Sequence, residues 1–576
     1  MDKALHEMSG RTGIWLQFCG VAILCGGFVA PIALGFWETL LPAFGILPAI
    51  GADTFSLNAW TALAALPGVW TSLRLTVFTG LLSTLLSLGL AVAFCASVHG
   101  RVGARRAERM LSPLLAVPHA AMAIGAAFLI APSGWLARLF SPWATTWGAP
   151  PAITTVHDAA GLSLVFGLVV KEVPFLLLVI IAALNQISAR QQLAAGRALG
   201  YGHGVIWIKI IFPQVYRQIR LPVYAVLAFA LSVVDMAIIL GPSNPPVLSV
   251  AAMRWFMSAD VDLLLPAAAA SILQIAVVVA GISGWWLGEK LVAAAGRAVI
   301  RRGGRGLESE PLIRFATVCV LALLAAGFAA ILSLIVWSFT WRWSFPDALP
   351  SSFTTSIWVR SASGWLHALA NTAGLGFGST LLSLLLAILW LEGEDRSGRR
   401  LLPGAPVILY LPLLLPQIGF LYGLQVTFLR AGIDGSPTTV LWGHTLFVFP
   451  YVMLALSDPW RALDRRYVRT AAALGASPLR TLFRLKLPLL LRPLLAATAI
   501  GFAVSAAQYL PTLFLGAGRI ATLTTEAVTL SSGGDRRIIG VYAALQALVP
   551  LLVYGVAFAL PGMVYADRRE LNGVTV

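Results

Sequence analysis

Long runs of apolar residues, separated by short polar and basic stretches, dominate the sequence. A transmembrane helix needs about 20 mostly apolar residues, and twelve runs are long enough. In the first half of the chain they lie near residues 14–36, 72–97, 111–131, 159–184, 221–242 and 264–287. In the second half they lie near residues 315–338, 368–391, 403–429, 437–457, 491–513 and 539–565. The pattern predicts an all-α integral membrane protein with about 12 transmembrane helices.

A charged, glycine-containing stretch from Glu289 to Arg314 interrupts the series of spans. It indicates a linker, residues 289–314, between a first transmembrane half, residues 1–288, and a second, residues 315–576. Each half has six spans, and an even number gives both halves the same orientation. We therefore expect a pseudo-twofold axis along the membrane normal, with a translocation path between the halves.

Short repeated segments support this division. Ser-Thr-Leu-Leu-Ser-Leu begins at Ser83 and again at Ser379, and Pro118-His119 recurs as Pro416-Gln417. The offset between copies falls from 296–298 residues early in each half to about 275 later. The first half should therefore carry roughly 22 extra residues, which we place in the long loop near 132–157.

Composition agrees with a membrane protein. The chain of 576 residues is 59% hydrophobic and 11% charged, whereas soluble domains are about 25% charged. The net charge of +16 allows two interpretations, a nucleic-acid partner or arginines that mark the cytoplasmic side and touch anionic lipid. The second fits the apolar runs better, so we expect membrane lipid and no nucleic acid. The four cysteines lie in apolar runs and indicate core residues rather than disulfides.

The distribution of basic residues predicts the orientation. Of 40 lysines and arginines, 30 fall on one face and nine on the other, with Lys171 inside a span. The richer face carries the N-terminus, the loops at 98–110 and 392–402, two longer loops, the linker and the C-terminal tail. Positive residues favour the cytoplasm, so both termini and both longer loops should be cytoplasmic. The first apolar run has no clear cleavage site and is expected to be a retained span.

The two longer loops carry the same pattern. Residues 194–200 read Ala-Ala-Gly-Arg-Ala-Leu-Gly and lead to Pro213; residues 469–475 read Arg-Thr-Ala-Ala-Ala-Leu-Gly and lead to Pro488. The Pro follows the Gly by thirteen residues in each copy. The pattern predicts a short helix ended by a left-handed Gly, a second amphipathic helix, and a Pro where the chain re-enters an apolar span.

This pattern resembles the E-A-A-x3-G-x9-I-x-L-P loop of membrane subunits in binding-protein-dependent ABC importers. The resemblance implies a type I permease fold in a bacterial inner membrane, a periplasmic solute-binding protein, and two ATPase subunits that receive the loops as coupling helices. The Gly and Pro match in both copies, and each copy keeps one Ala in register, Ala195 and Ala471. The resemblance therefore assigns to the coupling loops the residues Ala194, Ala195, Gly200, Pro213, Ala471, Ala472, Gly475 and Pro488. Ala194 and Arg469 stand where the motif has Glu, so neither copy carries the carboxylate for a salt bridge to the ATPase there.

Residues 506–511 and 515–519 are similar to fused, double-length permeases of the thiamine type. That resemblance implies thiamine or a related cation as the solute. Similar permeases carry ferric iron, polyamines or oxyanions, so the solute stays open.

Polar residues inside apolar spans are costly and usually functional. The candidates for the translocation path are His119, Lys171, Glu172, Asp235, Gln417 and Gln508. Lys171 and Glu172 are adjacent, so on a helix they point about 100° apart and cannot simply pair with each other. The alternative is that these groups form hydrogen bonds between helices and hold the bundle together.

Two segments on the outer face, 241–246 and 531–537, are candidates for contact with the binding protein. Ordinary connecting loops are the alternative.

No lysine follows a glycine, which excludes a P-loop, and the histidines lack zinc spacing. We therefore expect no enzyme activity, cofactor or metal in this chain.

The rival interpretation is a twelve-span secondary transporter of the major facilitator type. Residues 395–400 read Asp-Arg-Ser-Gly-Arg-Arg and are similar to a loop of that superfamily. However, Leu391 replaces the first Gly of that motif, and the first-half counterpart lacks the Asp. The matched Gly-to-Pro spacing of the two longer loops favours the importer permease.

Overall fold

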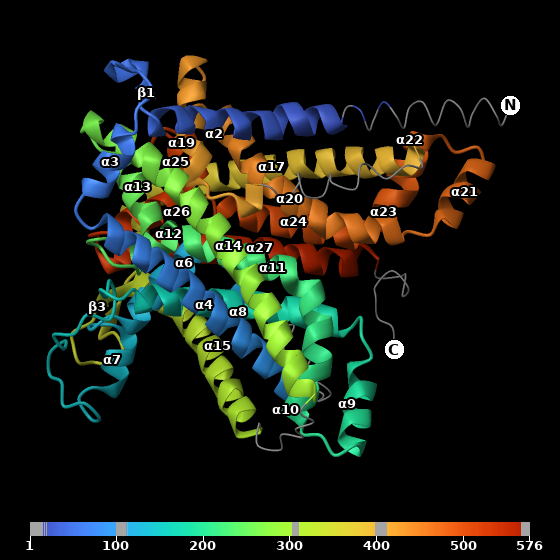
Figure 1. Ribbon diagram of the computed structural model, residues 1–576, viewed down its shortest axis with the longest axis horizontal. Coiled ribbons are helices and arrows are strands. Elements are labelled where there is room, and N and C mark those ends of the chain that lie inside the picture. The colour runs from blue at the N-terminus through green and yellow to red at the C-terminus, as the bar shows by residue number, and fades with distance from the viewer. Residues whose placement is uncertain are drawn as a thin grey trace.

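A computed structural model describes residues 15, 18, 20–98, 111, 113–301, 310–397 and 412–565. These residues form a helical bundle with two short hairpins (Figure 1), which confirms the all-α expectation. The first-half helices are η1 Cys25–Val29, α2 Ala30–Ala43, η2 Pro48–Ile50, α3 Asn58–Ala65, α4 Val69–Val98, α6 His119–Ile130, α7 Trp135–Phe140, α8 Leu162–Leu184, α9 Ala189–Ala198, α10 His203–Ile206, η3 Trp207–Ile211, α11 Phe212–Ser232, α12 Asp235–Ile239, α13 Leu248–Phe256, η4 Val261–Leu263 and α14 Leu264–Arg301.

The second half follows the same order of elements. Its helices are α15 Glu310–Phe339, α16 Ser356–Arg360, α17 Ala362–Ser397, α19 Ile418–Arg430, α20 Pro437–Ala462, α21 Arg465–Ala473, α22 Pro478–Thr481, η6 Leu482–Lys486, α23 Leu487–Leu489, α24 Leu491–Ala506, α25 Leu510–Leu515, α26 Leu523–Ser531 and α27 Arg536–Val564. The antiparallel hairpins pair β1 Ile46–Leu47 with β2 Ala52–Asp53, and β3 Thr340–Arg342 with β4 Ser352–Phe353. In Figure 1, α9 and α21 lie at one end of the bundle, the loop end, and α7, β1 and β3 lie at the opposite end.

Among the described residues, nine helices are long and apolar enough to span a membrane, or ten if the bent pair Pro478–Leu489 and Leu491–Ala506 counts as one span. Two of the twelve expected spans do not form a single long helix in the described residues. The run at 221–242 is interrupted at Val233 and Val234, between α11 and α12. The run at 403–429 is helical over α19, while residues 403–411 lie outside the described part.

The third and fifth spans are broken at repeat-related places. Pro118 precedes α6, and Pro416 lies two residues before α19. A proline lacks the amide proton that an uninterrupted helix needs, and its ring clashes with the preceding turn. The fifth span of each half breaks after Ser232 and after Ala506. Helix ends are therefore placed inside the bundle, where their backbone groups need partners.

Each half covers the first helix of the other. Gly423 in α19 meets Gly35 in α2 so closely that an added Cβ would lie 2.0 Å from the Gly35 carbonyl oxygen. The Gly423 amide also donates to Thr39 Oγ1 at 3.2 Å. Its repeat counterpart Gly125 in α6 meets Ala330 in α15 in the same way. Small residues allow helices to approach closely within a membrane, and these two contacts interlock the halves.

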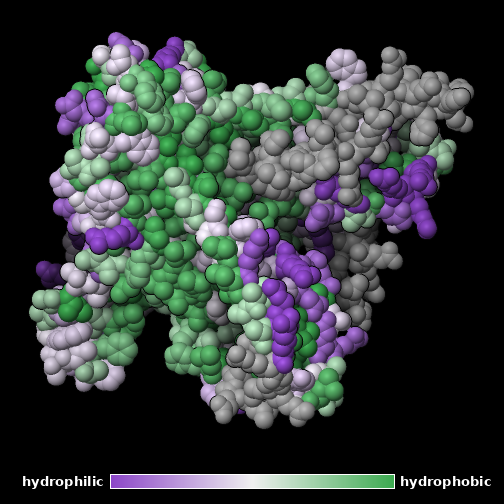
Figure 2. Space-filling model, in the orientation of Figure 1, coloured by the Kyte–Doolittle hydropathy of each residue, from purple (hydrophilic) through white to green (hydrophobic). Residues whose placement is uncertain are grey.

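The bundle carries a broad apolar surface. Figure 2 shows hydrophobic side chains over the middle of one face, with hydrophilic groups gathered toward the two ends. In α15, for example, Val318, Leu321 and Leu332 are exposed. Such a band suits contact with lipid tails.

The extra residues of the first half lie where the repeat offsets place them. Between α6 and α8 there are 31 residues, whereas six separate α19 from α20. The insertion forms α7, and its buried Arg138 donates to the carbonyl oxygens of Trp343 and Ser344 in the second half, at 3.3 and 2.6 Å. The insertion thus ties the two halves together at the end opposite the loops.

Several of the loops and termini whose lysines and arginines predict the orientation lie wholly or partly outside the described residues. Residues 1–14, 99–110, 302–309, 398–411 and 566–576 lie outside the described residues. Much of the expected linker is helical, because α14 continues to Arg301 and α15 begins at Glu310.

Candidate coupling loops and polar seam

The two longer loops have the same backbone. Gly200 ends α9 and Gly475 ends α21, and both have φ of +79°. In the first loop, the Gly200 amide donates to the Arg197 carbonyl at 2.9 Å and the Tyr201 amide to that of Gly196 at 3.1 Å. This pair of bonds is the Schellman motif, which a left-handed Gly permits. The expected left-handed turn is confirmed in this loop.

The second loop repeats these bonds. The Gly475 amide donates to the Ala472 carbonyl at 2.9 Å, and the Ala476 amide to that of Ala471 at 3.0 Å. A π-helical turn follows in each loop, η3 at 207–211 and η6 at 482–486, which are 275 residues apart. Pro213 lies in the first turn of α11, and Pro488 lies in α23, just before the 76° bend into α24. The two loops are therefore copies in three dimensions.

The helix of each loop has a packed side and an exposed tip. Gly196 stands where the importer motif has its second Ala, and an added Cβ would lie 2.7 Å from the Ile206 side chain. Ala194, Ala195 and Ala472 are exposed, and Ala471 is half-buried. At the tips, Leu199 is 67% exposed and its counterpart Leu474 is 83% exposed. Unpartnered leucines at repeat-related tips are suited to contact with another protein.

The first loop is tied to the end of α4 by a histidine. His203 Nε2 lies 2.6 Å from the Ala96 carbonyl oxygen, and its Nδ1 lies 3.0 Å from Arg197 Nη2. Because a carbonyl only accepts and a guanidinium only donates, these partners favour a neutral ring with its proton on Nε2.

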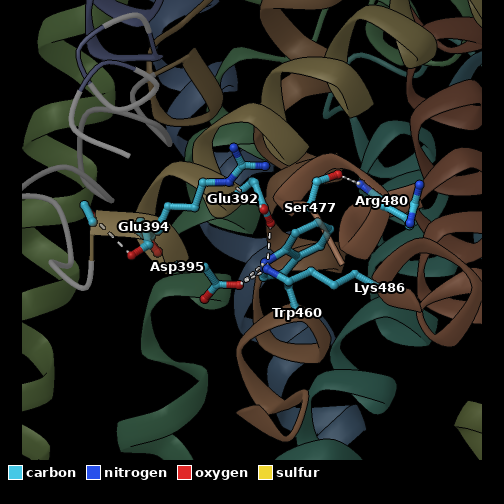
Figure 3. Close-up of polar contacts among 9 residues, drawn as sticks. Glu392, Glu394, Asp395, Trp460, Ser477, Arg480 and Lys486 are labelled. Carbon is cyan, nitrogen blue, oxygen red and sulfur yellow. Dashed lines mark hydrogen bonds and ion pairs between the residues drawn. The ribbon is translucent and has the colours of Figure 1, made fainter. Parts of the chain in front are cut away.

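The second loop is tied to the end of α17 by a buried lysine (Figure 3). Lys486 Nζ donates to Glu392 Oε2 at 2.6 Å and to Asp395 Oδ2 at 2.7 Å. Trp460 Nε1 donates to the same Asp395 oxygen at 3.1 Å, and Arg396 donates to Glu392 at 2.8 Å. Sequence reasoning missed this cluster, which joins residues more than 90 positions apart.

The other stem of the second loop is fixed to the same helix. Arg461, in the last turn of α20, donates to Glu394 at 3.0 Å, and Trp390 Nε1 donates to the other Glu394 oxygen at 3.1 Å. The acidic end of α17 thus holds the loop both where the chain leaves the bundle and where it returns.

The polar residues inside the spans divide into separate groups. Lys171, in α8, donates to the carbonyl oxygens of Leu114 and Leu115, each at 3.0 Å, and to that of Val117. An ammonium group has three protons, so these bonds use all of its donors. They satisfy carbonyls that the break before α6 leaves free. These are bonds of the kind expected if Lys171 holds the bundle together, which was the alternative to a place on the path.

Glu172 points elsewhere, as the 100° separation predicts. Its Oε1 lies 3.6 Å from His119 Nε2 at the start of α6, and the His119 ring lies 4.6 Å from the Phe229 ring. Asp235, the first residue of α12, is close enough to interact electrostatically with His119. The breaks in the third and fifth spans thus bring three of the six predicted residues together.

The second half adds two tyrosines to this group. Tyr451 lies near enough to Glu172, and Tyr509 near enough to Asp235, for the charge of each carboxylate to act on the phenol. We call His119, Glu172, Asp235, Tyr451 and Tyr509 the polar seam. Tyr451 follows Pro450, the repeat counterpart of Pro174, and Tyr509 follows Gln508, but nothing in the sequence distinguishes the two tyrosines as part of the seam.

The two predicted glutamines lie at two other breaks in the spans. Gln417 precedes α19, and Gln508 lies in the break between α24 and α25. Among the described residues, neither side chain forms a hydrogen bond with His119, Glu172 or Asp235. His444 is another buried polar group that sequence reasoning missed: its ring nitrogens lie 2.7 Å from Ser505 Oγ and 2.9 Å from Thr512 Oγ1.

The end opposite the loops holds the two predicted docking segments. In the first, the Ser243 carbonyl accepts from Arg254 at 2.8 Å, and the Gly241 carbonyl lies 2.7 Å from His157 Nδ1. In the second, Asp535 caps α27; its hydrogen bonds with Arg537 outweigh desolvation and lower the pKa of the carboxyl. Both segments are ordered loops with exposed tips. The described residues contain no cluster of metal-ligating side chains.

Comparison with known proteins decides the family. No family model matches the chain. The inner membrane ABC transporter permease protein YnjC of Escherichia coli K12 is 34% identical over 522 residues, which are 90% of this chain and 94% of that protein. The chain belongs to the ABC transporter permeases. It is therefore a multi-pass membrane transport protein and not an enzyme, and it works with an ATP-hydrolysing partner and a solute-binding protein.

Other relatives match about a third of the chain. The molybdenum transport permease ModB of Mycobacterium tuberculosis is 28% identical over 198 residues, 32% of this chain and 75% of its own length. The putative 2-aminoethylphosphonate permease PhnV of Salmonella typhimurium is 24% identical over 212 residues, 36% of this chain and 79% of its own. Single-length relatives and a full-length one together identify a fused, double-length permease. They give no support to a facilitator, and Asp395 binds the second loop instead.

Proposed function

We propose that this permease imports a small organic cation, thiamine or a related compound, through a path along the polar seam. Two ATPase subunits drive it, one seated on each of the matching loops, and a periplasmic binding protein delivers the solute at the opposite end. One observation carries the choice of a cation. The seam contains two acidic side chains, Glu172 and Asp235, and the His119 imidazole, while the ammonium of the nearby Lys171 is directed at backbone carbonyls outside the seam.

The chemistry of the seam favours organic ammonium compounds. Carboxylates attract a cation directly, and the rings of Tyr451, Tyr509 and Phe229 offer faces on which a flat or quaternary cation packs. A charge inside a membrane is expensive unless it has a partner. A positively charged solute would be such a partner for Glu172 and Asp235 and would therefore bind more favourably than a neutral or negative one. The relatives are named for molybdenum, 2-aminoethylphosphonate and putrescine, and their names alone do not select a solute.

The two matched loops receive the movement of the ATPase subunits. Their surplus of basic residues favours a cytoplasmic position, and the exposed Leu199 and Leu474 give each ATPase an apolar contact without the usual motif glutamate. When the ATPases close on ATP, they draw the loops together, and rigid helices carry this motion to the seam. Access to the path then changes from one side of the membrane to the other.

Uptake into proteoliposomes tests the proposal. The permease is reconstituted with its ATPase and binding protein, and labelled thiamine, putrescine and molybdate are supplied from the side of the binding protein. We expect ATP-dependent uptake of a cation and none of molybdate. Uptake of molybdate but of neither cation would refute the cationic path. Uptake without ATP would refute the proposal that the ATPase subunits power transport.

A further inference from the structure

The two loops are held to the bundle at the same point of the repeat but by different chemistry. Ala96 and Glu392 are 296 residues apart, the offset that relates Ser83 to Ser379. In the first half, the Ala96 carbonyl binds His203. In the second half, the Glu392 carboxylate binds Lys486. One anchor is neutral and the other is a buried group of opposite charges.

The charged contact between Lys486 and Glu392 is shielded from water. Lys486 is 3% exposed and Glu392 is 5% exposed, so water hardly competes for their contact. The ammonium also lies over the ring of Trp460, 5.5 Å from its centroid. Lys486 is the last residue of the π-helical turn η6, whereas the first-half turn ends at the buried apolar Ile211. Turns of this kind are rare and tend to occur at functional positions.

We propose that Lys486, through Glu392 and Asp395, is a positioning residue that transmits movement of the second loop to α17. In the described residues the acidic end of α17 holds both stems of this loop, Lys486 on one side and Arg461 on the other. Motion delivered to α21 is therefore passed to a 36-residue helix that crosses the whole bundle. In the first half, the stem that follows the loop is held by another charged pair, Arg220 with Glu289 of α14 at 2.8 Å, so the two loops pass movement to different helices.

This inference rests on the proposed docking of the loops, and the experiment separates the two. The permease is purified with its ATPase subunits, in a background where the four native cysteines are alanine. Spin labels are placed at the exposed positions Ser243 and Ser532, on the two segments opposite the loops. The probe is ATP with vanadate, and the readout is the change in the distance between the labels, which needs no identified solute.

The decisive variants alter the anchor with and without leaving charge unpaired. Lys486→Met removes the ammonium, and the double change Lys486→Met and Asp395→Asn keeps the site neutral, because Arg396 still pairs with Glu392. Lys486→Arg preserves the charge, and Arg519→Gln is the matched control because it breaks an exposed pair with Asp434 far from the loops. We expect both Met variants to bind the ATPase and to keep the ATP hydrolysis measured without solute, while the fraction of molecules that change distance falls about fivefold or more. Lys486→Arg and Arg519→Gln should keep the change.

Three outcomes would overturn the inference. The first is an unchanged distance response in the neutral double variant. The second is loss of ATPase binding in both Met variants, because the anchor would then act only in assembly. The third is an equal loss in Arg519→Gln. Failure of the proposed function looks different, since the unaltered complex would then show no response to ATP and vanadate.

Discussion

Lys171 and Leu114 form a hydrogen bond of 3.0 Å that closes the break in the third span of the first half. The repeat counterpart of Lys171 is Phe447 by the offset that relates Pro174 to Pro450. The second half therefore has no ammonium at this position. The pseudo-twofold repeat preserves the break but not the means of satisfying its carbonyls.

Replacing Lys171 with Met should destabilise the protein. Leu114, Leu115 and Val117 would keep carbonyls that no longer receive the ammonium protons, and a buried unsatisfied polar group costs about 1–3 kcal/mol. We expect a lower thermal unfolding midpoint in detergent. Lys290→Met is the control, because Lys290 is exposed on α14 over the ring of Trp286. Equal midpoints for the two variants would contradict the role of the three bonds.

Glu172→Gln should reduce cation uptake with little effect on stability. The change keeps the shape of the side chain and removes its charge beside His119, and an interaction with a charged group is worth about 1.5–3 kcal/mol, or tenfold and more in rate. The measurement is the initial rate of ATP-driven thiamine or putrescine uptake. Glu38→Gln is the control, since Glu38 pairs with Arg430 at 2.7 Å away from the seam. A similar loss in both variants would show that the seam has no special part in transport.

Gly475→Val should disrupt the end of the second coupling helix. A β-branched residue at φ of +79° is strained by about 1–3 kcal/mol. An added Cβ at Gly475 meets no atom within 4 Å, so the effect comes from the backbone alone. Solute-stimulated ATP hydrolysis should fall while the permease stays in the membrane. Gly374→Val is the control, because that Gly lies within a helix and also has free space; full stimulation in Gly475→Val would argue against docking at this loop.

Local patterns in the sequence were sufficient to predict the loops. Gly200 and Gly475 end helices for reasons that lie within a few residues, and Pro213 and Pro488 mark the return to apolar spans. The polar seam was partly predictable, since charge in an apolar run identified Glu172 and Asp235. Its tyrosines look like ordinary aromatic residues until the fold brings them beside those carboxylates.

The anchor of the second loop could not be predicted because it joins distant segments. Glu392 and Asp395 lie 94 and 91 residues before Lys486, and the acidic end of α17 resembled a facilitator motif when considered alone. The same limit applies to the broken spans. A run of 20 apolar residues predicts the length of a helix, but the partner that satisfies a break, such as Lys171, is apparent only in the packed structure.

His203 allows the weaker anchor to be tested on its own. Because its ring is neutral and donates one proton to Ala96, the bond should be worth about 1 kcal/mol, less than a bond between charged groups. His203→Phe fills similar space without a donor, whereas His203→Gln retains an amide that donates to the same carbonyl. In the purified complex with its ATPase, solute-stimulated hydrolysis should fall in His203→Phe by less than in Lys486→Met and should be largely restored in His203→Gln. The expected order follows from the strengths of the contacts, since His203 forms a neutral hydrogen bond and Lys486 a buried ion pair. A larger loss in His203→Phe than in Lys486→Met would contradict it.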